Sequence, residues 1–536
     1  MKSKVSRLAL VLAGVLPYAL PYLAHLIRLQ AGATGFIQYD QPYYLANGRA
    51  IFERGNGLAY PNPYDPSPDA PVIYVQWLIW VLGAGVSALG VDPGVWLDLL
   101  GILAALACSY ATLRLVEWVI GDGTDPGFAF LLVMWGGGIF AWHGLWTWLS
   151  GPERSLPSLG TAMAGAESGL GWWCLFWGRN VVLPLEGVYH ALMGWCWLAA
   201  LRGRWALALG LAVLLGATHP FTGAQVIAIL CVGSIVFRLA WGPERVPAWV
   251  FPAFWGLLAV FAGYYLAFLN LFPSHRALQE VWSLAWRIDG ASWLRSHLLV
   301  GVFAAWRLIK DGRNVGRDVP FLAAAFVVSL ALSNHDLFMR ARQPAHFSRG
   351  YSWLALALIG LPAVCETIGR LGTRRKAVAA FVLVVASLDN VVWLATTSLG
   401  AEPPGIALKP GEREILATIN RLGFRGVLLT EDARLSYLAA TYTAVRPYRG
   451  HDYNTPDSEL RRARVRDWFW KGEIGPWFDE VDLILVEHGR LAARHLRGRW
   501  EVAASGHQFE VLGRVRLPSA VETLRRGPTG GSGQLN

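Results

Sequence analysis

Long apolar runs of about 20 residues recur along the chain as far as residue 399, with short polar links between them. A helix of that length matches the hydrocarbon core of a bilayer. The runs predict eleven membrane-spanning helices, near residues 8–27, 95–118, 127–149, 186–201, 205–219, 222–240, 247–270, 293–309, 319–334, 351–368 and 377–397. Tryptophans gather near the ends of these runs, where an interfacial aromatic belt would lie. The pattern therefore predicts a polytopic α-helical membrane protein.

A further apolar run, residues 72–89, bears on this count, because an extra crossing would exchange the sides of all later links. Basic residues cluster in four links, at Arg202/Arg204, Arg238/Arg245, Lys310/Arg313/Arg317 and Arg370/Arg374/Arg375/Lys376. If 72–89 does not cross, these links share the cytoplasmic side with the basic N-terminus, as the positive-inside rule requires. We therefore predict a surface or re-entrant helix at 72–89, an N-terminus inside and a C-terminal part outside.

The first apolar run has one alternative interpretation. The triplet Ala31-Gly32-Ala33 resembles a signal-peptide cleavage site, although residues 8–27 are longer than the usual apolar core of a signal peptide. Both interpretations place the following residues on the outer side of the membrane.

The composition agrees with a membrane protein. Hydrophobic residues make up 54% of the 536 residues and charged residues only 16%, which is few for a soluble chain. The net charge of +10 comes from basic links between apolar runs, so we predict no nucleic-acid partner. The five cysteines lie in or beside apolar runs without a CxxC pair, which is typical of packing residues.

The pattern changes after about residue 400, where short apolar stretches alternate with charged, amphipathic ones. It predicts helices over 412–422, 433–441, 458–470 and 490–496, and strands over 426–429, 482–486, 500–503 and 509–515. We therefore expect a membrane domain at 1–399, a small extracytoplasmic α/β domain at 400–520 and a flexible Gly/Ser-rich tail at 521–536.

The first outer loop, residues 28–94, holds the strongest candidate for chemistry. It carries Asp40 among three tyrosines, Tyr39, Tyr43 and Tyr44, and its remaining apolar residues predict short helices on the membrane surface. A carboxylate beside a membrane suits proton transfer to or from a lipid-borne substrate. The alternative is that Asp40 caps a helix that begins at Pro42.

A second candidate is the outer segment NHDLFMRARQPAHFSRG, residues 334–350. Its four basic residues, Arg340, Arg342, His346 and Arg349, run against the charge distribution elsewhere and suit a phosphate group. The alternatives are anchoring to lipid headgroups and a salt bridge to Asp336.

Three further polar residues lie at outer ends of predicted spans. His219 lies in THPFTG, and Glu186 precedes His190 by one helical turn. A single histidine at such a position is more often a packing residue, and a Glu/His pair alone is weak evidence for a metal. In the outer domain the polar loop Arg449–Asp457 has the composition of a turn before a helix.

The loop sequence YDQPYYLANGRAIFERG, followed by a YP-x-P…P-x-x-Y return, resembles the C-type glycosyltransferase superfamily. The resemblance is nearest to bacterial relatives of protein O-mannosyltransferases and lipid A aminoarabinose transferases, and extends loosely to THPFTG and RQPAHFSRGY. It implies that Asp40 is a general base or positions the acceptor. Members often have a second acid beside it, where this chain has Gln41. The resemblance leaves a divalent metal ion open.

The resemblance implies transfer of a sugar from a polyprenyl-phosphate donor to an extracytoplasmic acceptor, in the cytoplasmic (inner) membrane of a bacterium. The tyrosines, Glu186, His219 and the basic residues of 340–349 would bind the substrates. Two other functions stay open, namely a catalytically degenerate membrane subunit and a transporter of lipid-linked glycans. Charged residues in the middle of apolar runs are scarce, which speaks against transport.

Overall fold

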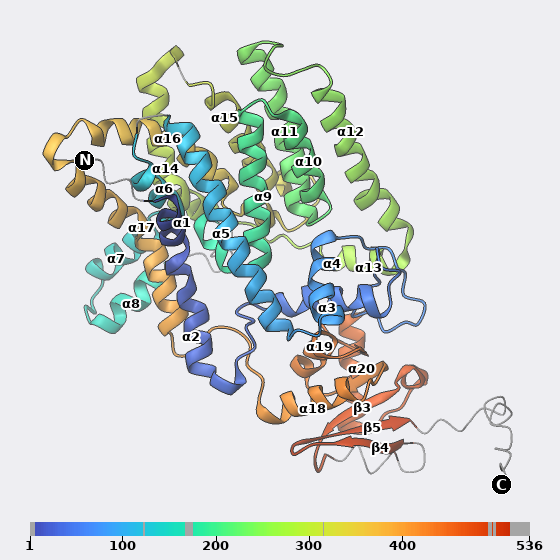
Figure 1. The fold of residues 1–536 in the computed structure, drawn as a ribbon. Helices are drawn as coiled ribbons and strands as arrows, with labels where there is room; N and C mark the ends of the chain where they lie inside the picture. Colours follow the sequence, from blue (N-terminus) through green and yellow to red (C-terminus); the bar gives the residue numbers. More distant parts are fainter. Residues whose placement is uncertain are drawn as a thin grey trace, which may run out of the picture. The chain divides into compact units, whose positions relative to one another are not determined.

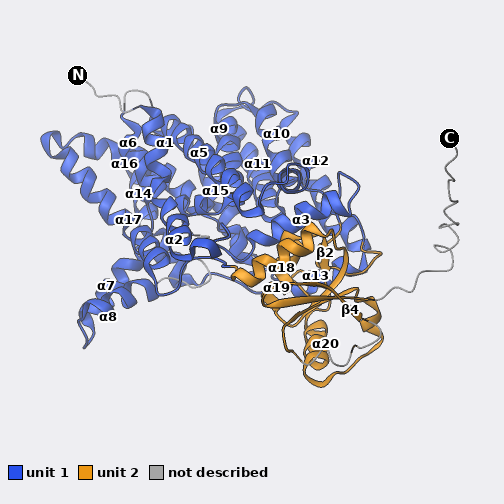
Figure 2. Cartoon of the chain, turned by 60° about the horizontal axis from the view of Figure 1, so that its bottom comes forward, with its two compact units in different colours: residues 1–60, 71–407 blue, residues 61–70, 408–536 orange. Residues whose placement is uncertain are grey.

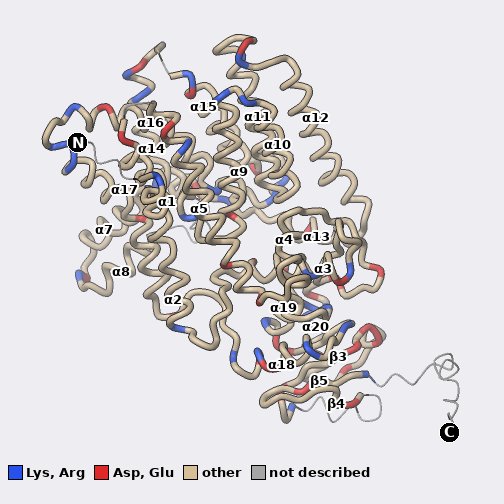
Figure 3. Tube along the Cα trace, viewed as in Figure 1, with Lys and Arg blue, Asp and Glu red and all other residues tan. Residues whose placement is uncertain are grey.

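The computed structural model describes residues 6–121, 124–166, 175–314, 316–490, 496 and 500–514. The chain divides into two compact units (Figure 2). Unit 1 comprises residues 1–60 and 71–407, and unit 2 comprises residues 61–70 and 408–536. Charged residues are sparse along the helices of unit 1 and dense in unit 2 (Figure 3).

Unit 1 consists of helices, many of which run side by side (Figure 1). The α-helices are α1 (Arg7–Val15), α2 (Leu20–Leu29), α3 (Gln41–Glu53), α4 (Trp77–Gly83), α5 (Pro93–Ile120), α6 (Pro126–Trp135), α7 (Phe140–Ser150), α8 (Leu156–Gly165), α9 (Pro184–Leu201), α10 (Trp205–Gly216), α11 (Pro220–Trp241), α12 (Val250–Ala262), α13 (Pro273–Val281), α14 (Gly290–Asp311), α15 (Val319–Ser333), α16 (Tyr351–Gly369) and α17 (Arg375–Leu399). Short turns join several of them, among them η9 (Pro344–Phe347) before α16.

Six helical segments of the described residues are long and apolar enough to cross a membrane. They are Arg7–Gly32, Pro93–Ile120, Pro220–Trp241, Val250–Leu271, Pro344–Gly369 and Gly372–Leu399. The chain is therefore an integral membrane protein. Four other predicted spans coincide with α9, α10, α14 and α15, and the run at 72–89 forms only the short helix Trp77–Ala88. Eleven crossings and the side on which each link lies stay predictions.

The span predicted over 127–149 consists of two helices, α6 and α7, which together are long and apolar enough to cross a membrane and are bent by 65° at the break between them. Whether the pair crosses the membrane as one broken span stays a prediction. The break falls at Gly136, Gly137 and Gly138, and glycine is a poor helix former. A Cβ on Gly138 would lie 2.2 Å from the backbone oxygen of Arg295, so only glycine allows α14 to approach this closely.

A buried polar network holds this break. The carboxylate of Asp389, on α17, accepts hydrogen bonds from the backbone N–H groups of Gly138 (2.8 Å), Phe140 (3.2 Å) and Ala141 (2.7 Å). The next residue, Asn390, donates to the backbone oxygens of residues 135 (2.7 Å) and 136 (3.0 Å) and accepts from Arg179 (2.5 Å). We call Arg179, Asp389 and Asn390 the break network. It supplies partners for backbone groups that a continuous helix would have paired internally.

Unit 2 contains a five-stranded sheet in the order β2-β1-β3-β5-β4. Strands β1, β2 and β3 are parallel, whereas β5 pairs antiparallel with both β3 and β4. The elements are α18 (Pro410–Arg421), β1 (Gly426–Thr430), α19 (Ala433–Tyr442), β2 (Val445–Pro447), α20 (Ser458–Lys471), β3 (Leu483–Glu487), β4 (Trp500–Ser505) and β5 (Phe509–Arg514). The sequence predicted all of them except β2. The predicted helix 490–496 lies mostly outside the described residues, and the tail lies wholly outside them.

A segment of the first outer loop, residues 61–70, is part of unit 2. Tyr64 is fully buried there and stacks on Tyr437 with ring centroids 5.7 Å apart. Asn62 donates to the backbone oxygen of Asn454 (2.6 Å), and Arg446 on the edge strand β2 donates to the backbone oxygen of Ser67 (2.9 Å). The sequence analysis assigned the whole loop to the membrane domain and did not expect this. These contacts tie the segment to α19, to β2 and to the loop before α20.

Candidate active site

Asp40 lies at the turn into α3 and is half-buried. Its carboxylate accepts a hydrogen bond from the Gln38 side chain (3.2 Å), while its backbone N–H donates to the same side chain (2.8 Å). Asp40 stands at the N-cap position but makes no capping hydrogen bond through its side chain, so the capping interpretation is wrong. Gln41 is buried and accepts from the Gln38 N–H (3.2 Å), which makes it part of the support of this turn.

The side chain of His25 fixes the chain just before Asp40 through hydrogen bonds. His25, on α2, is fully buried and directs Nδ1 at the backbone oxygen of Pro404 (2.7 Å). Its Nε2 accepts the N–H groups of Thr34 (3.0 Å) and Gly35 (2.9 Å), which assigns the proton to Nδ1. The Asp40 turn therefore begins from a rigid point rather than from a freely moving loop.

The three tyrosines differ in their surroundings. Tyr39 is 44% exposed, whereas Tyr43 and Tyr44 are half-buried. Burial raises the pKa of Tyr43 to about 12. Burial, followed by the charge of Asp40, also raises the pKa of Tyr44. Both hydroxyls therefore stay protonated near neutral pH and can donate hydrogen bonds to a substrate.

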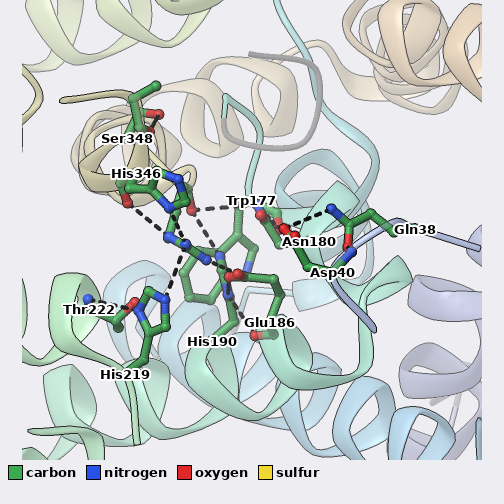
Figure 4. Close-up of polar contacts among 12 residues, drawn as sticks. Gln38, Asp40, Trp177, Asn180, Glu186, His190, His219, Thr222, His346 and Ser348 are labelled. Atoms are coloured by element: carbon green, nitrogen blue, oxygen red, sulfur yellow. Dashed lines mark hydrogen bonds and ion pairs between the residues drawn. The ribbon is translucent and has the colours of Figure 1, made fainter. Parts of the chain in front are cut away.

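Arg349 is the centre of a buried cluster at the start of α16. Its guanidinium forms an ion pair with Glu186, from the first turn of α9, and donates to His346 Nδ1 (2.8 Å). It also approaches His219 Nε2 (3.4 Å), at the N-cap of α11. In Figure 4 the side chains of Glu186, His219 and His346 converge. We call Glu186, His219, His346 and Arg349 the Arg349 cluster.

The backbone around Arg349 is unusual as well. Its φ is +30°, a conformation that side-chain-bearing residues rarely adopt, and Gly350 follows with a φ of +71°. A Cβ on Gly350 would lie 2.6 Å from the backbone nitrogen of Trp177, so this glycine permits close packing. The oxygen of Arg349 faces His190 Nε2 (2.8 Å). The chain thus holds Arg349 in a strained conformation through packing and hydrogen bonds.

The Asp40 turn and the Arg349 cluster are electrostatic neighbours. The charges of Asp40 and Arg349 both act on the Tyr44 hydroxyl. The charge of Asp40 also acts on His346. An acid from the first outer loop and a cation from residues 340–349 thus act on the same tyrosine hydroxyl of unit 1. That the two serve one site stays a prediction.

The two other arginines of that segment lie apart from this cluster. Arg340 is exposed and pairs with Glu280 on α13, which lowers the pKa of Glu280 chiefly through the hydrogen bond. The salt bridge to Asp336 that the sequence suggested is wrong, since Asp336 pairs with Arg287 (3.5 Å).

Arg342 donates to the side-chain oxygen of Gln279 (2.5 Å), whose amide contacts His275 (2.8 Å). His275 in turn contacts the hydroxyl of Tyr74 (3.0 Å). Burial, with the nearby charge of Arg342, lowers the pKa of His275 to about 4, so this histidine is neutral near pH 7. These contacts connect Arg342 to Tyr74, near the end of the first outer loop, rather than to Arg349.

The donor set does not fit a metal ion. Both ring nitrogens of His190 face backbone oxygens, those of Glu186 (2.8 Å) and Arg349 (2.8 Å). Glu186 is already paired with Arg349. Over the described part of the chain, no three side chains of His, Cys, Asp or Glu are grouped as ligands. We therefore derive no step through a metal.

Aromatic side chains that the sequence analysis did not single out complete the site. Tyr189 stacks on His219 with ring centroids 4.8 Å apart, and Phe221 stacks on His346 at 4.7 Å. Phe221 lies inside the THPFTG motif, and Tyr189 directly precedes His190. Their closeness in sequence to these candidate residues is the signal that could have identified them.

Solved structures offer a comparison, whereas no family model and no curated protein matches the sequence. ArnT from Cupriavidus metallidurans bound to undecaprenyl phosphate is 11% identical, with 93% of this chain and 97% of that chain covered and a TM-score of 0.46. The oligosaccharyltransferase AglB from Archaeoglobus fulgidus, with an inhibitory peptide and a dolichol-phosphate, is 12% identical, with 90% and 69% covered and a TM-score of 0.42.

Both neighbours are C-type glycosyltransferases, the superfamily that the sequence resembles. With TM-scores below 0.5, these likenesses carry no argument about the reaction. The reaction has to be inferred from the residues of this chain.

Proposed function

We propose that this chain is a membrane glycosyltransferase of the C-type superfamily, which transfers a sugar from a polyprenyl-phosphate donor to an extracytoplasmic acceptor. The observation that carries the proposal is that the charges of one acid, Asp40, and of the buried guanidinium of Arg349 both act on the Tyr44 hydroxyl of unit 1. A transfer from a lipid phosphate needs both a proton acceptor and a positive group for the leaving phosphate.

In this mechanism Asp40 accepts the proton of the acceptor hydroxyl as that oxygen attacks the anomeric carbon. The bond between the anomeric carbon and the phosphate oxygen breaks, and the lipid phosphate leaves with the electron pair. Attack opposite the leaving group inverts the anomeric centre. Arg349 and the N–H groups of its histidine neighbours stabilise the phosphate, and Tyr43 and Tyr44 hold the sugar or acceptor by donating hydrogen bonds.

Glu186 has a role in this cluster besides pairing. Its Oε1 pairs with Arg349, while its buried Oε2 has no hydrogen-bond partner among the described residues and lies 3.8 Å from His190 Nδ1. Without a ligand, Glu186 keeps the buried guanidinium from being an isolated charge. When a lipid phosphate arrives, the guanidinium has a stronger anion to bind, and Glu186 keeps it oriented.

The test is transfer by the purified parent chain in vesicles that contain undecaprenyl-phosphate-linked, radiolabelled sugars and isolated bacterial envelope as acceptor. We expect label to enter the envelope fraction, with release of undecaprenyl phosphate. A degenerate subunit predicts intact donor and no transfer. A transporter predicts that the labelled lipid changes leaflet with its sugar still attached. Either of these results would exclude the proposed reaction.

The proposed orientation has a separate test. We expect an N-terminus inside, eleven crossings and residues after about 400 outside, because this arrangement keeps the basic links cytoplasmic. Reporter fusions at Arg313 and Gly405 should report opposite sides of the membrane. If both report the same side, the predicted number of crossings between these two positions is wrong and the proposed topology fails.

A further inference from the structure

A cavity with polar side chains in its lining lies between α7, α8 and the start of α14. Its volume is about 310 Å³, which is in the range of small-ligand sites. The polar side chains that line it are His143 and Thr147 on α7, Thr161 on α8 and Arg295 on α14. Small residues of α8 form the remaining wall. None of these residues belongs to the Arg349 cluster or to the Asp40 turn.

The helix break builds this cavity through backbone contacts. The N–H of Ile139 donates to the backbone oxygen of Arg295 (2.8 Å), and Gly138 lets the two backbones approach. Further along α7, Gly144 allows α8 to pack equally close, since a Cβ on Gly144 would lie 2.4 Å from the backbone oxygen of Ala162. The fold therefore fixes the backbone of Arg295, and its side chain is available to bind a ligand.

Arg295 brings a positive charge to the cavity that no described residue pairs with. Over the residues that the structure describes, neither a hydrogen bond nor an ion pair engages the guanidinium of Arg295 or the ring of His143. The two threonine hydroxyls donate to their own helices, to the oxygens of His143 (2.9 Å) and Pro157 (3.1 Å). Recognition of a ligand would therefore depend on the arginine and the histidine. A guanidinium suits a phosphate because its N–H groups can bind two oxygens at once.

The helices that line this cavity also carry large exposed apolar side chains. Trp146 and Leu149 on α7 are 69% and 46% exposed, and Leu156 on α8 and Leu294 on α14 are 82% and 62% exposed. Helices that carry large exposed apolar side chains as well as polar ones present such a surface to lipid. Such a surface presents the cavity to headgroups and the apolar side chains to acyl chains.

We propose that the cavity between α7, α8 and α14 binds the phosphate-monoester headgroup of a membrane lipid. Arg295 is the main binding residue and His143 the second. The apolar surroundings favour a phosphate that carries acyl chains over free phosphate. This site is additional to the proposed donor site, and its test does not depend on the sugar-transfer reaction.

The experiment measures binding to the purified full chain in a neutral detergent, by the rise in its thermal midpoint with ligand concentration. The probes are dioctanoyl phosphatidic acid, dioctanoyl glycerol as the uncharged amphiphile, and inorganic phosphate. We expect phosphatidic acid to bind at least about tenfold more tightly than the other two, and Arg295→Gln to weaken it by a similar factor. Arg276→Gln, an exposed arginine on α13, is the matched control and should bind as the parent does.

Three results would overturn the proposal. Equal binding of dioctanoyl glycerol would mean that only apolar contact is involved, and equal binding of inorganic phosphate would make the ligand a free anion. Unchanged binding of phosphatidic acid by Arg295→Gln would exclude this cavity. If that variant does not accumulate, His143→Gln serves in its place and should weaken phosphatidic acid binding by severalfold.

Discussion

Two buried polar groups in unit 1 use the same kinds of side chain for different ends. In the break network, the carboxylate of Asp389 accepts hydrogen bonds from three backbone N–H groups, and Asn390 donates hydrogen bonds to two backbone oxygens. In the Arg349 cluster, the charged and titratable side chains face one another. The first arrangement leaves nothing for a ligand, whereas the second can exchange one partner for another.

The comparison also explains a charge that the sequence analysis overlooked. Asp389 lies inside the apolar run 377–397, and a buried carboxylate in such a run is a mark of transport sites. Its hydrogen bonds show another role, since it stabilises the backbone of a broken helix as such breaks require. The functional reading of a charged residue in a membrane therefore depends on whether backbone groups have already engaged it.

The largest expected effect concerns Arg349. Arg349→Gln removes the cation that would stabilise the leaving phosphate, and we expect transfer to fall on the order of a thousandfold. Because this variant also leaves Glu186 without its counter-charge, the double variant Arg349→Gln/Glu186→Gln is the control. Transfer should stay lost in the double variant even if stability returns. If the double variant regained both stability and transfer, the Arg349 cluster would have only a structural role, as the break network does.

The next effect concerns stability rather than chemistry. Asp389→Ala leaves three backbone N–H groups without their partner, and we expect it to destabilise the folded chain by about 3 kcal/mol or more. Thermal unfolding in detergent measures the loss, with Ser387→Ala on the same helix as the control. Transfer per folded molecule should stay near the parent value. A selective loss of transfer at unchanged stability would mean that Asp389 takes part in the reaction.

The smallest effect is expected at Arg340. Its ion pair with Glu280 is exposed on both sides, so Arg340→Gln should leave the thermal midpoint close to that of the parent chain. Transfer and donor affinity should change by less than about threefold, since exposed ion pairs contribute little. Donor binding curves at low and high salt are the measurement. A clear rise in the dissociation constant at low salt would restore Arg340 to the donor site that the sequence suggested.

Much of the fold follows from local pattern. The apolar runs and the amphipathic stretches gave the positions of helices and of most strands, because helix and strand periods are local properties. The helix break had a local signal too, in Gly136, Gly137 and Gly138, but the sequence analysis gave more weight to the length of the apolar run. The pair Asp389-Asn390 was a second signal, whose meaning depends on a contact with a distant helix.

The site was foreseeable only in part. Polar residues at the predicted outer ends of spans pointed to Glu186, His219, His346 and Arg349, because span ends predicted on one membrane face are expected to lie close together. Which arginine is buried with Glu186 and which is exposed and pairs with Glu280 of α13 depends on tertiary packing, so Arg340 and Arg349 looked alike in sequence. The same holds for Tyr64, whose proline-rich surroundings predict a loop but not the unit that receives it.

The central claim is that Asp40 accepts a proton during sugar transfer, and Asp40→Asn tests it most directly. The variant keeps the size of the side chain and removes the charge, while Gln38 and Gln41 still support the turn. With donor and acceptor present, we expect turnover to fall by about a hundredfold or more, with donor affinity and thermal stability close to those of the parent chain. Sugar transfer by Asp40→Asn at the rate of the parent chain would contradict the claim.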